Sequence, residues 1–336
     1  MRKMMIAALI VPVLALGLLL SGASKQQDAS EASGLSGVVR VDGSSTVFPI
    51  TEAVGEEFQM KHRDVRVTVG ISGTGGGFKK FTVGETDIND ASRPIKEKEA
   101  TLAASNSIDY IELPVAFDGL SVMVNPANTW VDHLSIEELH KIWQPGSTVK
   151  TWKDVRPEWP DRPLVLYGPD VDSGTFDYFT EVVNGASQVS RSDYTASADD
   201  NVLVTGIAGD ANALGYFGFA YYEENQDKLK LVPIDGGAGP VAPSRETINN
   251  GTYAPLSRPL FIYVSTKAVQ RPEVQAFVQF YMDNAAQLSA EVGYVALPHE
   301  AYALGIKRFA ARQAGSVFNS DAAKSGKYSI AQLLGM

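Results

Sequence analysis

Three short stretches of the chain combine hydroxyl side chains with glycine. They are Gly43–Thr46, Ser72–Gly77 and Asp172–Thr175, and each precedes a segment whose apolar residues have helical spacing. The start of a helix exposes unpaired backbone N–H groups and carries the positive end of the helix dipole. One such stretch is an ordinary helix cap, but three in one chain predict an anion-binding site.

The second stretch is the most informative of the three. Its consecutive glycines, Gly75–Gly77, would each cost about 1 kcal/mol inside a helix relative to alanine. We therefore expect a ligand-binding loop here, followed by a helix that carries Phe78 and Phe81. The loop fits neither nucleotide-binding fingerprint. The third stretch could be a nucleophile turn, but it lacks the G-x-S-x-G frame.

Two charged residues lie near these stretches in the predicted fold. Arg93 follows a short strand and precedes Pro94, a position suited to a bidentate contact with an oxyanion, although a surface arginine is the alternative. Asp118 lies in an apolar stretch and precedes Gly119. Buried carboxylates need partners, so we expect a hydrogen bond with a functional or structural role, or else a turn aspartate.

The order of the predicted elements indicates an α/β fold. Strands near 38–41, 65–69 and 87–91 alternate with two helices, the first of which places its apolar residues on one face. In open α/β sheets, ligands bind at the carboxyl ends of the strands. The first two hydroxyl-glycine stretches lie at these ends.

The rest of the chain predicts a second lobe and a cleft. A long strand over 112–126 crosses out of the first lobe, and a strand over 259–265 returns. We expect residues 38–118 plus 258–336 to form lobe 1 and residues 119–257 to form lobe 2. The third stretch then belongs to lobe 2, so a ligand that touches all three would bridge and close the cleft. Residues 233–251, rich in Gly, Pro and Ser, predict a loop.

The N-terminus has the layout of a secretory signal. Arg2 and Lys3 precede an apolar run and the small residues Ser21–Ala23, which predicts a signal peptide over residues 1–23 and a flexible tether over 24–37. The alternative is an uncleaved membrane anchor. The residues before Ala23 resemble a lipoprotein signal, but Ala23 stands where the lipidated cysteine would be.

Composition excludes several classes of protein. The 336 residues are 44% hydrophobic and 20% charged, as in a soluble globular protein, and the chain has no cysteine for disulfides or thiolate metal sites. The net charge of −10 argues against binding to nucleic acid. The four histidines lack the spacing of metal ligands, so we expect neither a metal nor a cofactor.

Seven segments in order carry a resemblance to a known family. The segments VDGSSTVFPI, ISGTGGGFKKF, ASRPI, FDGLSVMVNP, IWQPGSTVKTWKDVRPEWP, DSGTFDYFTE and PLSRPLFIYVS are similar to the phosphate-binding protein of bacterial phosphate ABC transporters, the PstS family. The resemblance implies a type II periplasmic-binding-protein fold and capture of inorganic phosphate for a membrane permease. It also implies a monomer without enzymatic activity, exported to the periplasm or to the outer face of the bacterial cytoplasmic membrane.

The resemblance also implies a set of phosphate-binding residues. The matching positions are Ser45 and Thr46 in the first stretch, Ser72 in the second, and Ser173, Gly174 and Thr175 in the third, and we add the adjacent Ser44 as a candidate. Known members carry an arginine just before the third motif, where this chain reads Tyr167–Asp170, and an aspartate where it has Arg93. We therefore expect Arg93 to supply the cation, and Asp118 or Asp172 to supply the acceptor.

An acceptor carboxylate would make the site selective. Phosphate at neutral pH still carries a proton that a carboxylate can accept, whereas sulfate has none. Three alternatives stay open from the sequence. They are binding of another oxyanion such as molybdate, tungstate or sulfate, sensing of phosphate without transport, and an exported phosphatase with Ser173 or Thr175 as nucleophile.

Overall fold

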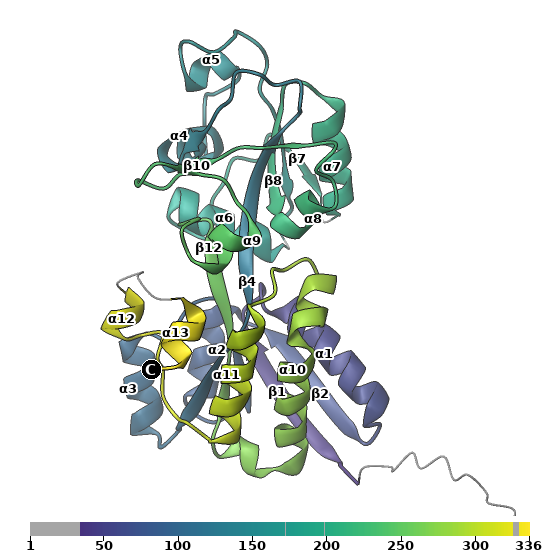
Figure 1. Ribbon diagram of the computed structural model, residues 1–336, viewed down its shortest axis with the longest axis vertical. Helices are drawn as coiled ribbons and strands as arrows, with labels where there is room; N and C mark the ends of the chain where they lie inside the picture. The colour runs from purple at the N-terminus through teal and green to yellow at the C-terminus, as the bar shows by residue number, and fades with distance from the viewer. Residues whose placement is uncertain (1–33, 172, 198, 325–328) are drawn as a thin grey trace, which may run out of the picture. The chain divides into compact units, whose positions relative to one another are not determined.

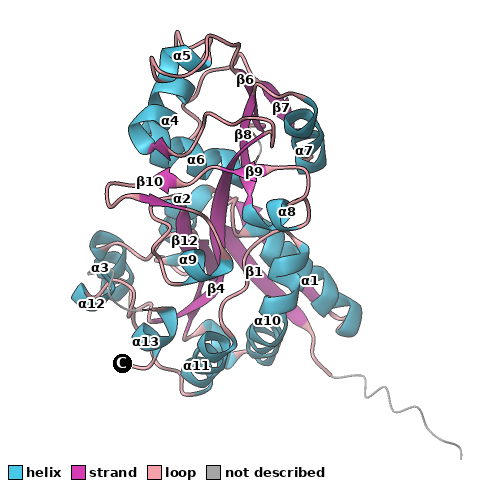
Figure 2. Cartoon of the chain, turned by 45° about the horizontal axis from the view of Figure 1, so that its top comes forward, coloured by secondary structure: helices cyan, strands magenta, loops and turns pink. Residues whose placement is uncertain are grey.

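One mixed sheet runs through the computed structural model, with strands in the order β2-β1-β3-β12-β4-β8-β6-β7 and with β9 also paired to β4 (Figures 1 and 2). The structure describes residues 34–171, 173–197, 199–324 and 329–336. The predicted signal peptide and residues 24–33 of the predicted tether lie outside the described residues, and β1 begins at Gly37.

The strands of this sheet are β1 (Gly37–Gly43), β2 (Val65–Ile71), β3 (Ile88–Ala91), β4 (Tyr110–Val124), β6 (Val165–Pro169), β7 (Thr195–Ser197), β8 (Ala213–Gly218), β9 (Lys230–Leu231) and β12 (Ser257–Ser265). A smaller sheet contains β5 (Leu134–Ser135), β10 (Ile234–Asp235) and β11 (Pro240–Val241).

The α-helices are α1 (Phe48–Lys61), α2 (Gly73–Phe81), α3 (Glu97–Ser105), α4 (Ile136–Trp143), α5 (Trp152–Val155), α6 (Gly174–Asn184), α7 (Asp200–Gly209), α8 (Phe219–Glu223), α9 (Arg245–Asn249), α10 (Pro272–Glu291), α11 (His299–Ala310), α12 (Asp321–Lys324) and α13 (Ile330–Leu334). A 3₁₀ turn, η1, spans Ala268–Gln270.

Strand β4 connects the two halves of the sheet, and all 15 of its residues are buried. From Tyr110 to Gly119 it pairs with β12, and from Leu120 to Val124 it pairs with β8. The first half of the sheet, which contains β1, β2, β3 and β12, is covered by α1, α2, α10 and α11. The second half, which contains β6, β7 and β8, is covered by α6 and α7 (Figure 1). The predicted two-lobe α/β fold with two crossing strands, β4 and β12, is therefore confirmed.

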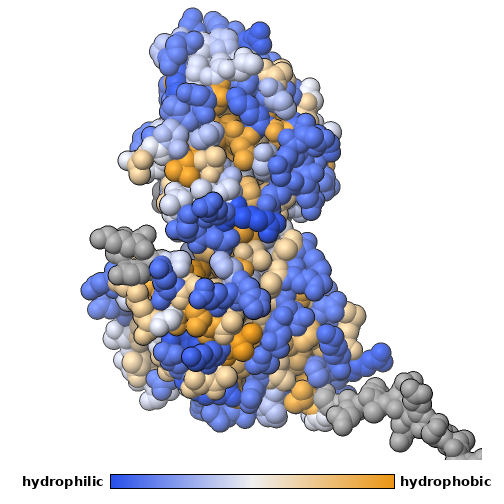
Figure 3. Space-filling model, in the orientation of Figure 1, coloured by the Kyte–Doolittle hydropathy of each residue, from blue (hydrophilic) through white to orange (hydrophobic). Residues whose placement is uncertain are grey.

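Apolar packing within each half explains why these segments form helices. On α1, the predicted face of Val47, Ile50, Val54 and Phe58 is fully buried, and Phe58 meets Phe277 of α10 edge to face at 5.4 Å. In the second half, Phe179 of α6 stacks on Tyr216 of β8 with 3.6 Å between ring centroids. The face in Figure 3 is mostly hydrophilic, with apolar residues in small groups. Among the described helices, none combines the length and hydrophobicity needed to cross a bilayer.

The structure corrects two local predictions. Residues 233–251 are not one loop, because they form β10, β11 and α9. Gly75–Gly77 do not form a loop before a helix, because α2 already begins at Gly73. Packing accounts for the second error: a Cβ on Gly77 would overlap the side chain of Asn89 and lie 2.6 Å from the Cα of Gly43. Glycine therefore allows α2 to approach the end of β1.

This packing gives a testable difference between two glycines of one helix. We expect Gly77→Ala to lower the free energy of unfolding by about 1–3 kcal/mol, because the added methyl group must displace β1 or β3. In Gly75→Ala the nearest atom to the added methyl group would be Nη2 of Arg93 at 3.9 Å, so stability should stay equal or rise by up to ~1 kcal/mol through helix propensity. Urea unfolding measures the stability of both variants. Equal losses of stability in Gly77→Ala and Gly75→Ala would contradict this account.

The core of the first half contains a carboxyl group. Asp90 of β3 is fully buried, and this burial, reinforced by the nearby charge of Asp42, raises the pKa of Asp90 to about 8 from 3.8. The folded protein keeps this proton up to about pH 8, whereas the unfolded chain loses it near pH 3.8. The wild type therefore loses stability as the pH rises between these values.

Asp90→Asn should remove this pH dependence. We expect the free energy of unfolding of the variant, relative to wild type, to increase with pH across that window by ~1.4 kcal/mol per pH unit. Urea unfolding between pH 4 and 9 measures the difference. Asp283→Asn, at an exposed position of α10, controls for the loss of one negative charge. A difference that stays constant with pH would show that Asp90 is ionised in the folded core.

Candidate functional site

Two cavities meet where the hydroxyl-glycine stretches come together. Cavity A, of about 330 Å³, is lined by Ser44, Ser45, Thr46, Gly73, Thr74, Gly75, Ser92, Arg93, Lys96, Asp177, Glu181, Ser187 and Arg258. Cavity B, of about 370 Å³, is lined by Ser45, Phe48, Pro49, Ile71, Asp118, Asp170, Ser173, Gly174, Thr175, Asp200, Gly218, Tyr221, Val292, Gly293 and Tyr294. Ser45 lines both cavities.

The start of α2 at cavity A has backbone donors without a side-chain cap, because Ser72, which precedes the helix, does not cap it through a side-chain hydrogen bond. The start of α1 differs, since the N–H groups of Phe48 and Ile50 donate to backbone carbonyls and Pro49 has none. The N–H groups of the first turn of α2 therefore remain available beside Gly73, Thr74 and Gly75, which line the cavity. Uncapped N–H groups at the positive end of a helix dipole favour an anion.

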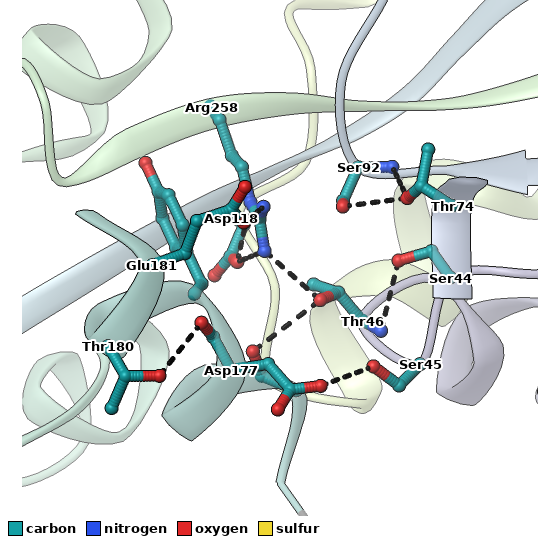
Figure 4. A network of polar contacts seen from close by, with 12 residues as sticks. Ser44, Ser45, Thr46, Thr74, Ser92, Asp118, Asp177, Thr180, Glu181 and Arg258 are labelled. Atoms are coloured by element: carbon teal, nitrogen blue, oxygen red, sulfur yellow. Dashed lines mark hydrogen bonds and ion pairs between the residues drawn. The ribbon is translucent and has the colours of Figure 1, made fainter. Parts of the chain in front are cut away.

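Arg258 supplies a full positive charge to cavity A. It lies on β12 with its side chain 14% exposed, and Nη2 donates to Oγ1 of Thr46 at 3.1 Å (Figure 4). Its Nε and Nη2 lie 3.4 and 3.5 Å from Oδ2 of Asp118. The guanidinium also lies 3.6 Å from the ring centroid of Tyr178. These contacts hold the guanidinium plane at the cavity wall.

Asp118 balances the charge of Arg258. Its side chain is almost completely buried on β4, and burial raises the pKa of this carboxyl group, while the adjacent Arg258 acts in the opposite direction. Removal of either partner would leave the other charge buried without compensation. The prediction that Asp118 takes part in a polar contact within an apolar stretch is therefore confirmed, with Arg258 as its partner.

Contacts between α6 and the first stretch join the two lobes at the site. The hydroxyl of Ser45 donates to Oδ2 of Asp177 at 3.0 Å, and that of Thr46 donates to the carbonyl of Gly174 at 3.5 Å (Figure 4). The second carboxylate oxygen of Asp177 is buried and has no hydrogen-bond partner among the described residues. Asp177 thus brings a carboxylate group to the wall of cavity A.

The predicted cation, Arg93, lies at cavity A but is already paired. Its Nη1 and Nη2 donate to the two carboxylate oxygens of Glu99 at 2.9 and 2.8 Å, and Nη1 also reaches the carbonyl of Pro94. This ion pair lowers the pKa of Glu99 against the opposing effect of burial. A guanidinium bound bidentately by a neighbour has fewer donors for a ligand.

The other predicted residues are divided between the cavities. Ser44, Ser45 and Thr46 line cavity A, whereas Ser173, Gly174 and Thr175 line cavity B. The hydroxyl of Ser173 accepts from the N–H of Thr175 and so caps α6. Ser72 lines neither of these cavities, because its hydroxyl donates to Asp42. Asp172 lies outside the described residues.

Sequence reasoning missed Arg258 and Asp177 as site residues, and it included Thr74 in a predicted binding stretch without assigning it a contact. A signal for the first was present, since the tripeptide Ser-Arg-Pro occurs twice, at 92–94 and at 257–259. Both copies place an arginine beside a strand of the first half, and both arginines line cavity A. Thr74 bonds to Ser92 through their hydroxyls at 3.0 Å, which ties α2 to the end of β3.

Taken together, this arrangement can bind a tetrahedral oxyanion. Cavity A presents hydroxyl donors, helical N–H groups and the guanidinium groups of Arg258 and of Arg93, the second of which is paired with Glu99. The carboxylates of Asp177 and Glu181 also line it. Such a donor set suits the oxygens of phosphate or a similar anion, and a carboxylate can accept a proton from the ligand.

Comparisons with known proteins identify the family. A family model described as a PBP superfamily domain matches residues 24–285. A protein named SphX from Synechocystis sp. is 49% identical over 93% of this chain and 92% of its own length. The phosphate-binding protein PstS of Staphylococcus saprophyticus is 41% identical over 79% of this chain and 82% of its own length.

A solved structure supports the same assignment. The crystal structure of a possible phosphate binding protein from Planctomyces limnophilus is 51% identical and has a TM-score of 0.81. The match covers 83% of this chain and 99% of the other. With its two-lobe fold, its cleft and these relatives, the chain belongs to the PBP superfamily and, within it, to the PstS family of phosphate-binding proteins.

Proposed function

We propose that the protein is an exported, monomeric solute-binding protein that captures inorganic phosphate in the cleft between its lobes and delivers it to an ABC transporter permease. The observation that carries this proposal is the convergence of Ser44–Thr46, the start of α2, Ser92 and Arg258 on cavity A. The names of two relatives, a phosphate-binding protein and a possible phosphate binding protein, support phosphate as the ligand.

In this proposal, phosphate takes over contacts that already join the lobes. Ser45 and Thr46 donate across the cleft to Asp177 and Gly174. A phosphate oxygen would replace each acceptor, and the Ser173–Thr175 turn would reach the ligand from the cavity B side. Arg258 is the principal cation, because its contacts with Asp118 are longer than those of Arg93 with Glu99. Arg93 and Ser72 stay in the proposal as secondary contacts.

The carboxylates give the proposed selectivity for phosphate. Asp118, which lines cavity B, and Asp177, which lines cavity A, are the described candidates to accept the ligand proton. Sulfate offers no proton to either group, so it would meet uncompensated negative charge. Asp172 keeps its predicted acceptor role only as a proposal from the sequence.

The proposal includes the predicted division of the chain. Residues 1–23 would direct export, 24–37 would act as a tether, 38–118 plus 258–336 would form lobe 1, and 119–257 would form lobe 2. The change of pairing partner along β4 between Gly119 and Leu120 supports this lobe boundary. The protein would then act in the periplasm or on the outer face of a bacterial cytoplasmic membrane.

An exported phosphatase is the alternative from another class. It would require Ser173 or Thr175 to be activated by a neighbouring base. The Ser173 hydroxyl instead accepts from the N–H of Thr175 as a helix cap, which favours binding over catalysis. Turnover of a chromogenic phosphate ester that disappears in Ser173→Ala would support the phosphatase.

Calorimetry with two anions tests the proposed ligand. We expect the wild type to bind phosphate and to reject sulfate by roughly 10⁴-fold, because sulfate cannot donate to the site's carboxylates. Molybdate and tungstate titrations test the other oxyanions. Equal affinities for phosphate and sulfate, or an absence of phosphate binding, would refute the proposed function.

A matched pair of variants distinguishes the two arginines of cavity A. Arg258→Met should weaken phosphate binding by about 10²-fold, because it removes a charge-assisted hydrogen bond from a buried site. Arg93→Met should weaken binding by ~threefold or less, since Glu99 already occupies that guanidinium.

Titration calorimetry at low salt measures both affinities, and circular dichroism verifies that each variant is folded. A larger loss of phosphate affinity in Arg93→Met than in Arg258→Met would show that Arg93 is the principal cation.

A further inference from the structure

A buried tyrosine lies beneath the segment that carries Ser92 and Arg93. Tyr263 of β12 is fully buried, and its hydroxyl accepts a hydrogen bond from the backbone N–H of Ile95 at 2.8 Å. Ile95 lies in the short connection from β3 to α3, in which Ser92 and Arg93 line cavity A. This bond ties that connection to the central strands of the sheet.

Glu112 fixes the orientation of the Tyr263 hydroxyl. The two residues are register partners on β4 and β12, and Tyr263 donates to Oε1 of Glu112 at 2.5 Å. The remaining acceptor positions of Glu112 are filled by the hydroxyl of Ser316 at 2.7 Å and the N–H groups of Val317 and Phe318 at 2.8 and 3.1 Å. Because the tyrosine proton points to Glu112, its oxygen faces Ile95 as an acceptor.

The ring of Tyr263 also supports helix α2, whose first residues form another part of the wall of cavity A. It packs edge to face on Phe78 of α2, with 4.9 Å between ring centroids. Helix α2 carries Thr74, whose hydroxyl bonds to that of Ser92. Tyr263 therefore contacts both segments that the Thr74–Ser92 bond joins. Its hydroxyl contacts the connection from β3 to α3, and its ring contacts α2.

We propose that Tyr263 is a positioning residue for oxyanion binding, which holds the Ser92–Pro94 connection against α2 through its bond to the Ile95 N–H. The proposal rests on the proposed function, because it assigns a role in the same site. Tyr263 does not touch the ligand in this arrangement. Its effect passes through Ile95 to Ser92 and Arg93.

Tyr263→Phe removes the bond and keeps the ring. We expect phosphate affinity to fall about tenfold, because the connection loses its anchor while the aromatic packing on Phe78 remains. Tyr302→Phe is the matched control, since its buried hydroxyl likewise accepts from a backbone N–H, that of Leu297, and donates to a buried partner, the Val115 carbonyl. Ser316→Ala removes a donor to Glu112 but leaves the Ile95 bond intact.

Both controls should bind phosphate within ~twofold of the wild type while losing stability comparable to that of Tyr263→Phe. Calorimetry measures affinity, and urea unfolding measures stability. Wild-type affinity in Tyr263→Phe, or an equal loss in either control, would overturn the proposal and leave the proposed function intact. A wild type that does not bind phosphate would overturn both.

Amide exchange in the wild type provides a second test that needs no variant. Phosphate should slow exchange at Ile95 at least ~10-fold more than at Leu297, because binding and the Ile95 anchor stabilise each other reciprocally. Global stabilisation by the ligand would protect both amides alike. Equal protection at Ile95 and Leu297 would overturn the positioning role even if Tyr263→Phe did not fold.

Discussion

The pairing of Arg258 with Asp118 is the interaction on which the arrangement of the cleft depends. The two residues face each other in the register of β12 and β4, the strands that cross between the halves of the sheet. Both side chains are largely buried, so each charge needs the other to remain in the interior. Arg258 also holds Thr46, which connects this ion pair to the first hydroxyl-glycine stretch. A single buried pair thus links the strands that join the lobes with a wall of cavity A.

Around this pair, similar residues have taken different roles. Ser72 and Ser173 both precede helices, yet Ser173 caps α6 whereas Ser72 turns toward Asp42, which also binds Lys80 at 2.6 Å. The start of α2 therefore keeps its N–H groups free of a side-chain cap at cavity A, while the start of α6 does not. The two arginines also differ in how many of their donors are free. Glu99 binds the guanidinium of Arg93 in a bidentate pair, whereas the contacts of Arg258 with Asp118 are longer. Local geometry, more than residue type, decides which donors remain available to a ligand.

Local patterns in the sequence were sufficient for much of the fold. The apolar face of α1 and the long apolar run of β4 each depend on neighbouring residues, and each was predicted. Long-range contacts were not accessible in this way. Nothing near Gly77 in sequence reveals that Asn89 and Gly43 lie against it, and nothing near Arg258 reveals that β12 places it opposite Asp118. The contiguous motifs of the candidate site were recognisable in the sequence, whereas the place of Arg258, which depends on strand register, was not.

The continuity of the sheet through β4 has a mechanical consequence. Since one strand belongs to both halves, the cleft cannot open by a swing about a slack linker. Opening has to change the twist of the strand near Gly119, where a side chain would come within 2.6 Å of the Cδ1 atom of Ile248. Backbone pairing of β4 on both sides of Gly119, with β12 before it and β8 after it, opposes such a distortion, so the sheet itself keeps the two walls of the cleft aligned.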